Sequence, residues 1–232
     1  RNQLMKVKLI AYTQLSHRIH AGELSGEGLD NIQDLIAYCA RVSNPSNQAN
    51  TKTTPKLLEY LIKHKHWSPF EMASATIEVN TTRDIARQLL RHRSFSFQEF
   101  SQRYADVNGL GSAFELREAR MQDPTNRQNS VKTEDIHIQR AWRVLQEEVI
   151  AKAKHAYDWA IEAGIAKEQA RAVLPEGNTK SRLYVNGTIR SWIHYCDLRC
   201  ANGTQLEHME LARAIASAIG AIYPKMVDFA HD

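Results

Sequence analysis

The segment 82–104 concentrates residue types that could do chemistry. An Arg-His-Arg triplet at 91–93 is followed, after seven residues, by Ser101, and Arg103 comes two positions later. Guanidinium groups bind phosphate through paired, charge-assisted hydrogen bonds, and a nearby hydroxyl adds a further donor. The spacing therefore suits an anionic ligand.

Two interpretations of this basic segment require no small-molecule site. Cations near a helix C-terminus complement the helix dipole, so the triplet is compatible with a solvated helix end. Alternatively, arginines interleaved with Phe95, Phe97 and Phe100 would pair with phosphates and stack on the bases of a nucleic acid. Composition does not separate these alternatives, because the net charge of +4 suits an anionic small substrate as well as a nucleic acid.

The cysteines offer little reactive chemistry. Cys39, Cys196 and Cys200 form no CxxC pair, and an odd count does not suggest a disulfide framework. Cys196 and Cys200 are four residues apart and would share a helix face, with only His194 close to them. We therefore expect these thiols to pack, and we expect no bound metal.

The elements that must position these residues follow from hydrophobic periodicity and capping signals. Helices are predicted over residues 30–42, 55–63, 83–93, 134–163, 167–173, 188–198 and 205–223. Strands are predicted over residues 5–13, 73–81 and 181–186, with a loop at 66–71. The polar stretch 106–133 lacks periodicity and is expected to be an excursion loop. Helices outnumber strands without regular alternation, which indicates the α+β class.

The length and composition of the chain limit the class of protein to which it can belong. With 232 residues, 43% hydrophobic and 24% charged, the chain is expected to form a single domain over 1–232. No stretch approaches the roughly 18 apolar residues that cross a membrane, and no signal peptide is evident, so a cytoplasmic location without membrane contact is expected. A glycine-rich dinucleotide turn and a P-loop are absent, so a bound flavin or nucleotide must be held another way.

The segment 91–101, RHRSFSFQEFS, matches the Arg-His-Arg, seven residues, Ser signature of the flavin-dependent (alternative) thymidylate synthases, and the chain resembles that family. The resemblance covers roughly residues 5 to 225. It extends to further blocks in the same order, namely HWSPFE at 66–71, RQ at 87–88, RAVLP at 171–175, RSW at 190–192 and DLR at 197–199.

The resemblance implies an activity and an assembly. The family converts dUMP to dTMP with 5,10-methylenetetrahydrofolate as carbon donor, FAD as hydride mediator and NADPH or NADH as reductant. It implies a mixed or antiparallel sheet with flanking helices, in a homotetramer whose active sites lie between subunits. A nucleic-acid partner is then not expected.

The resemblance also assigns residues, by position, to each ligand. The residues assigned to dUMP are Gln88, Arg91, Glu99, Ser101, Gln102, Arg103, Arg171 and Arg199. The residues assigned to FAD are Ser43, His66, Ser68, Glu71, Arg91, His92, Arg93, Ser94, Glu99, Thr188, Arg190 and His194. Arg171 is expected to reach the substrate of a neighbouring subunit.

Two residues are assigned to the catalytic step. A cation such as Arg199 beside the pyrimidine carbonyls would stabilise negative charge on the activated ring. A serine hydroxyl is a weak nucleophile without an adjacent base, and no Ser-His-Asp spacing is evident around Ser101. We therefore expect Ser101 to orient the substrate. The cysteines match no catalytic position of the family, so the flavin is expected to carry the difficult steps.

Overall fold

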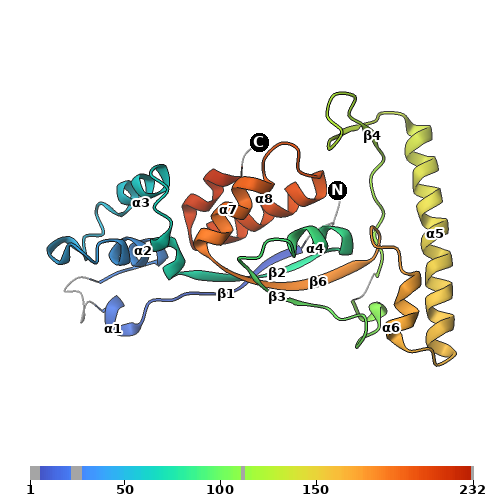
Figure 1. The fold of residues 1–232 in the computed structure, drawn as a ribbon, viewed down its shortest axis with the longest axis horizontal. Coiled ribbons are helices and arrows are strands. Elements are labelled where there is room, and N and C mark those ends of the chain that lie inside the picture. Colours follow the sequence, from blue (N-terminus) through green and yellow to red (C-terminus); the bar gives the residue numbers. More distant parts are fainter. Residues whose placement is uncertain (1–5, 22–27, 111–112, 231–232) are drawn as a thin grey trace.

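The computed structural model describes residues 6–21, 28–110 and 113–230. A four-stranded antiparallel sheet in the order β1-β2-β6-β3 runs along the middle of an elongated molecule, and a separate hairpin pairs β4 with β5 (Figure 1). The strands are β1 (Lys6–Tyr12), β2 (Ser74–Thr82), β3 (Ser96–Glu99), β4 (Arg120–Gln122), β5 (Ser130–Lys132) and β6 (Lys180–Thr188).

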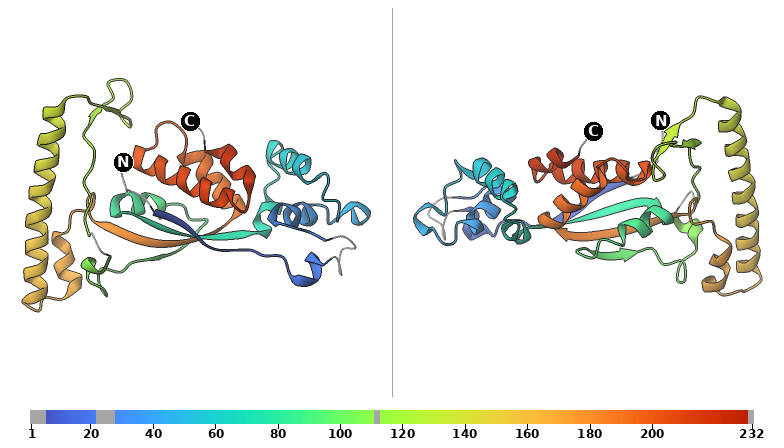
Figure 2. Two further views of the ribbon diagram at one scale, coloured as in Figure 1. Left: turned by 180° about the vertical axis from the view of Figure 1, so that it is seen from behind. Right: turned by 45° about the horizontal axis from the view of Figure 1, so that its top comes forward.

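Helices surround this sheet at both ends and over one face (Figure 2). The α-helices are α1 (His17–His20), α2 (Ile32–Ala40), α3 (Thr54–Lys63), α4 (Arg83–Leu89), α5 (Ile136–Glu162), α6 (Lys167–Ala170), α7 (Ile189–Arg199) and α8 (Leu206–Gly220). Short 3-10 helices are η1 (Pro45–Asn47), η2 (Ser68–Met72), η3 (Val107–Leu110), η4 (Arg171–Val173) and η5 (Pro224–Phe229).

The main core lies between the central strands and helices α4, α7 and α8. Alternate side chains of β6 are buried, and β2 is more fully buried, with Glu78 covered as well as its neighbours. The antiparallel register sets Ile77 opposite Val185 and Val79 opposite Leu183. Trp192 of α7 is fully buried here, and its Nε1 donates to the carbonyl oxygen of Ala75 at 3.1 Å. The indole thus fixes α7 against β2, which sets the position of every later residue of that helix.

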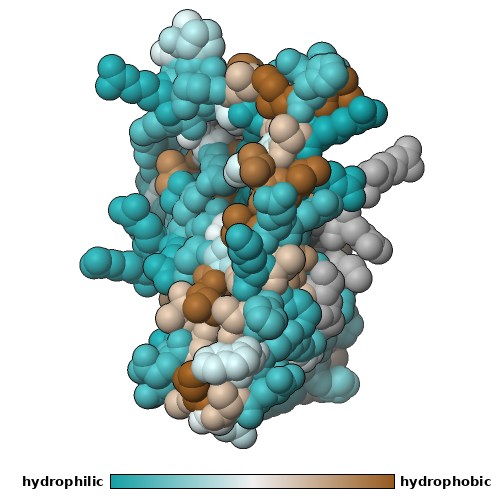
Figure 3. Space-filling view, turned by 90° about the vertical axis from the view of Figure 1, so that its right-hand side faces the viewer, coloured by the Kyte–Doolittle hydropathy of each residue, from teal (hydrophilic) through white to brown (hydrophobic). Residues whose placement is uncertain are grey.

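The long helix α5 stands at one end of the molecule (Figure 1). Asp135 caps it by accepting from the backbone N–H of Ile138 at 3.2 Å, and it is followed by Gly164 at φ +79°. Only part of it is buried, and apolar side chains gather along this end of the surface (Figure 3). The exposed apolar residues of α5 are Ile136, Ile138, Trp142, Val144, Leu145, Val149 and Trp159.

The structure confirms a helix-and-sheet fold with an antiparallel sheet and corrects three local predictions. The helix expected over 83–93 ends at Leu89, because the chain turns there, with the N–H of His92 donating to the Leu89 carbonyl. The turn leads into β3, a strand the periodicity did not predict. The excursion 106–133 is not a structureless loop, since it holds η3 and the β4–β5 hairpin. The first residue of the predicted strand 5–13 lies outside the described residues.

Candidate active site

The basic triplet lies in the turn between α4 and β3, and this turn is anchored by Phe95. The Phe95 ring is buried against Trp192, with ring centroids 4.3 Å apart. It occupies the space over Gly187, where a Cβ would come within 2.2 Å of the Phe95 ring. A glycine is therefore required in β6 for the turn to close. Arg91 and Arg93 are exposed, and neither side chain forms a hydrogen bond or ion pair with a described residue.

His92 points inward from the same turn and meets Arg199 at the end of α7. The Nε of Arg199 donates to Nε2 of His92 at 2.9 Å. Burial, together with the positive charge of Arg199, lowers the pKa of His92 to about 4. The imidazole is therefore neutral near pH 7 and accepts through Nε2, while the terminal nitrogens of Arg199 bond to no described residue.

Gln88 lies one turn before this pair, on α4. Its Nε2 donates to Oε1 of Gln205 at 2.7 Å, and its Oε1 is 3.1 Å from Nδ1 of His208. His208 is fully buried on α8, and its Nε2 is 3.1 Å from the hydroxyl of Tyr195. The predicted substrate residue is thus held by two polar partners at the start of α8, its N-cap residue Gln205 and the buried His208.

A second group of polar and aromatic residues lies where η2 meets the start of α7. Trp67 and His194 contact edge to face, with centroids 4.6 Å apart. Arg190 Nη1 pairs with Glu71 Oε1 at 2.9 Å. Thr188 caps α7, and Ser191 Oγ donates to the carbonyl oxygen of Ser94 at 3.4 Å. The exposed His66 and Ser68 belong to the same short segment.

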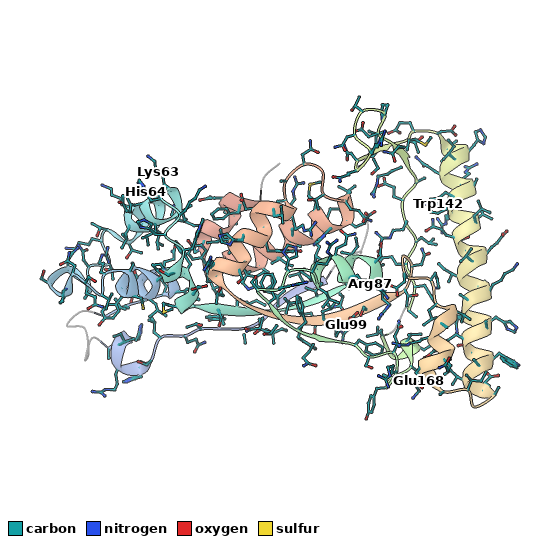
Figure 4. The ribbon with its side chains drawn as sticks, in the orientation of Figure 1. Lys63, His64, Arg87, Glu99, Trp142 and Glu168 are labelled. Atoms are coloured by element: carbon teal, nitrogen blue, oxygen red, sulfur yellow. The ribbon has the colours of Figure 1, made fainter. Side chains whose placement is uncertain are left out.

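A third group surrounds the end of β3. Ser181 Oγ donates to Oε1 of Glu99 at 2.7 Å. Arg103 pairs with Glu168 at 3.3 Å, and Arg171 Nε donates to the Glu168 backbone carbonyl at 3.3 Å. Figure 4 shows Glu168 towards the α5 end of the molecule and Glu99 nearer the middle.

The remaining predicted residues of this segment differ in burial. Ser101 is exposed, and its hydroxyl contacts no described histidine or carboxylate. Gln102 is 4% exposed, and its Nε2 has no hydrogen-bond partner among the described residues. An unpaired buried donor is costly, so this amide is the kind of group that a ligand or a further chain would satisfy.

Within one chain the predicted residues form three groups, at the turn after α4, at η2 and at the end of β3. Ser43 is exposed in the turn after α2. A cavity of about 490 Å³ is lined instead by residues such as Arg117, Arg120, Trp142 and Glu207. No predicted site residue lines it.

Comparison with known proteins decides the family. A family model described as thymidylate synthase complementing protein matches residues 27–225. A probable flavin-dependent thymidylate synthase of Paramecium bursaria Chlorella virus 1 is 53% identical over 81% of this chain and 85% of that protein. The flavin-dependent thymidylate synthase of a Synechocystis strain is 49% identical over 90% and 92%. The chain belongs to the flavin-dependent thymidylate synthase family.

Solved structures of a related enzyme share the fold of this flavin-dependent thymidylate synthase family member. A UMP/dUMP methylase from Streptomyces cacaoi, solved with 5-Br dUMP, is 26% identical and superposes with a TM-score of 0.79, covering 97% of this chain and 93% of that one.

The described residues contain no helix long and apolar enough to cross a membrane. They also contain no His, Cys, Asp or Glu cluster able to hold a metal ion.

The sequence did not identify the buried partners of Gln88. His208 occurs at helical spacing with the fully buried Leu211 and Ile215, so it falls on the apolar face of α8. A histidine in that position needs a hydrogen-bond partner, which is a signal that sequence reasoning could have used. The partner itself, Gln88, is 120 residues away and required the structure.

Proposed function

We propose that this chain is a thymidylate synthase that reductively methylates dUMP to dTMP, with 5,10-methylenetetrahydrofolate as carbon donor and NADPH or NADH as reductant. The observation that supports this most directly is Arg199. The hydrogen bond from its Nε to the neutral His92 fixes the guanidinium beside the turn that follows α4. Its terminal nitrogens bond to no described residue, so they are available to the carbonyl oxygens of a uracil ring.

The dUMP phosphate would be held by guanidinium groups. The exposed guanidinium of Arg91 has no partner among the described residues, while Arg103 makes only an exposed ion pair with Glu168. Such a pair contributes little, so exchanging it for a dianionic phosphate is favourable. Ser101 adds a hydroxyl in the same segment and would orient the substrate. Gln102 and Glu99 would complete the dUMP contacts.

Arg199 would act on the pyrimidine itself. When a nucleophilic carbon of the uracil ring is activated, negative charge develops on the carbonyl oxygens. A cation that is already oriented stabilises that charge without reorganisation at the moment of reaction. His92 keeps Arg199 in place and remains an acceptor, because its lowered pKa leaves it unprotonated near neutral pH.

The donor set at η2 and the start of α7 fits FAD. Arg93, Arg190 and the capped helix start offer positive charge and N–H groups for a pyrophosphate, and Ser94 and Thr188 add hydroxyls. Trp67 supplies an aromatic face. The further residues that would contact FAD are Ser43, His66, Ser68, Glu71, Arg91, His92, Glu99 and His194. When bound, FAD accepts hydride from the nicotinamide and supplies the reductive chemistry.

We also propose a homotetramer with active sites between subunits. The assigned residues lie in three groups in one chain, and Arg171 belongs to the group at Glu168, which lies towards the α5 end of the molecule (Figure 4). A second copy that covers the apolar side of α5 could bring such groups together. Trp159 and Leu145 of α5 are 59% and 54% exposed, which favours burial against another subunit. Each chain would act as one domain over 1–232, in the cytoplasm.

The first test is the absorption spectrum of the purified protein with and without added FAD. A bound flavin spectrum, followed by NADPH oxidation that responds to dUMP and by dTMP formation from methylenetetrahydrofolate, would support the proposed reaction. A protein that remains colourless and does not take up FAD would overturn it. Light scattering at several protein concentrations tests the assembly separately, because a monomer at the assay concentration contradicts shared active sites.

A further inference from the structure

We propose that His208 is a positioning residue for the nucleotide: it fixes the orientation of the Gln88 amide, so that Gln88 presents an N–H group, and not its carbonyl, to dUMP. This inference rests on the proposed function, since it concerns the binding of the same substrate. His208 itself is fully buried and would act only through Gln88.

The argument begins at Glu207, the first acidic residue of α8. Its side chain is 8% exposed, and Arg120 Nη2 pairs with Oε1 at 2.7 Å while Arg117 Nη1 lies 3.4 Å from Oε2. Two guanidinium groups keep the carboxylate ionised, so it only accepts hydrogen bonds. Gln205 Nε2, 3.0 Å from Glu207 Oε2, must therefore be a donor.

The direction of each following hydrogen bond is then determined. Because Nε2 of Gln205 faces Glu207, the Oε1 of Gln205 faces Gln88 and accepts from Gln88 Nε2 at 2.7 Å. The Oε1 of Gln88 consequently faces His208, 3.1 Å from Nδ1, and an oxygen there requires a proton on Nδ1. The Nε2 of His208 is left as an acceptor for the Tyr195 hydroxyl at 3.1 Å.

The imidazole can fill this role only in its neutral form. Burial, together with the charges of Arg199 and His92, lowers the pKa of His208 to about 3. Near neutral pH the ring thus has one donor and one acceptor, which match Gln88 and Tyr195. Tyr195 is also fully buried, so its hydrogen bond to His208 is shielded from water and helps to hold the ring in one orientation.

A fixed amide has a consequence for recognition. One of the two N–H groups of Gln88 is used by Gln205, and the carbonyl oxygen is used by His208. The remaining N–H is the only polar group of this side chain not yet paired, and it suits an oxygen acceptor on the nucleotide. Without His208, only the hydrogen bond to Gln205 would hold the amide in this orientation. Rotation by half a turn would set the Oε1 of Gln88 against the Oε1 of Gln205, and His208 adds a second contact that opposes it.

The test compares two polar replacements of one residue. In His208→Asn the side-chain amide occupies the place of Nδ1 and can still donate to Gln88. In His208→Gln it occupies the place of Nε2 and reaches Tyr195 instead. Leu211→Ala, at a fully buried position of the same helix, is the control for destabilisation that does not involve Gln88.

We expect His208→Gln to raise the KM and the Kd for dUMP about tenfold, because one hydrogen bond to a buried partner is lost. The kcat and the FAD content of this variant should change little. His208→Asn should remain within about threefold of the wild type. Leu211→Ala should lower Tm and leave KM for dUMP unchanged. Equal KM values for the Asn and Gln variants, or an equal rise in Leu211→Ala, would overturn the proposal. A wild-type protein that binds FAD and not dUMP would instead refute the proposed function, and this inference with it.

Discussion

Arg199 and His92 are joined by a 2.9 Å hydrogen bond from the guanidinium Nε to the imidazole Nε2. The bond links the end of α7 to the turn after α4, two segments 107 residues apart in sequence. It uses the inner nitrogen of the guanidinium and leaves the outer two for a ligand. The part of Arg199 that would contact dUMP is therefore distinct from the part that contacts the protein.

Replacement of Arg199 should therefore damage the reaction and spare the cofactor. We expect Arg199→Ala to retain FAD, to bind dUMP more weakly and to lower turnover by at least about 100-fold, as for the loss of a preorganised charge at a reacting group. Turnover and dUMP affinity are measured by NADPH oxidation and calorimetry. The control is Arg143→Ala, which removes an exposed ion pair with Glu147 on α5. Loss of FAD from the Arg199 variant alone would contradict this role.

Ser101 tests whether a covalent route operates. Its hydroxyl is exposed and contacts no described base, so it lacks the activation that a serine nucleophile needs. We expect Ser101→Ala to keep detectable dTMP formation, with a raised KM for dUMP. Complete loss of dTMP formation in a folded, flavin-loaded variant would restore the nucleophile hypothesis.

Local signals in the sequence were sufficient to predict the helices whose ends are set by neighbouring residues. The helix predicted over 134–163 is observed as α5, because its cap Asp135, its apolar stripe and Gly164 are all near in sequence. The shortened α4 shows where local signals fail. The periodicity continues past Leu89, but the turn is decided by Phe95 packing against Trp192 and by the space above Gly187. Those contacts are not local.

In the candidate site, too, the sequence predicts what depends on neighbouring residues and not what depends on distant contacts. The signature and its companion blocks predict which residues serve the ligands, and the structure brings His66 to Glu71 together with Arg190 and His194, as expected for one surface. Arg171 instead lies beside Glu168, in the group near the end of β3. The β4–β5 hairpin was missed because its strands are three residues each and follow no long alternation.

Arg190 provides a test of the flavin surface. Its ion pair with Glu71 is exposed, with 39% and 43% of the side chains accessible, so it should contribute less than about 1 kcal/mol to folding. We expect Arg190→Ala to unfold at nearly the wild-type denaturant concentration and to bind FAD about tenfold more weakly, since a charge-assisted hydrogen bond is lost. Flavin fluorescence titration measures the affinity. Wild-type FAD affinity in this variant would remove Arg190 from the site.

His208 should also determine part of the acid sensitivity of the fold. Its pKa in the folded protein is lowered from 6.5 to about 3, so below pH 6.5 the unfolded chain takes up a proton that the folded protein does not. Stability from this group is complete above pH 6.5 and falls as the pH drops towards 3, by at most about 1.4 kcal/mol per pH unit. We expect His208→Asn to lose less stability than the wild type between pH 6 and pH 4 in urea unfolding. If the stability of the variant and of the wild type fell equally with pH, His208 would take up its proton in the folded state as it does in the unfolded chain.

Glu115 should make the stability of the fold depend on pH in the opposite direction from His208. Burial raises the pKa of its carboxyl from 4.5 to about 7, an effect that nearby Lys180 and Arg117 only partly offset. The folded protein therefore keeps a proton that the unfolded chain releases, and the stability from this group is lost as the pH rises from 4.5 through 7. We expect Glu115→Gln, which stays neutral, to match the wild type near pH 4 and to exceed its stability above pH 7. The exposed Glu147→Gln is the matched control and should show no such gain. If the two variants respond alike to pH, the gain does not come from burial of the Glu115 carboxyl.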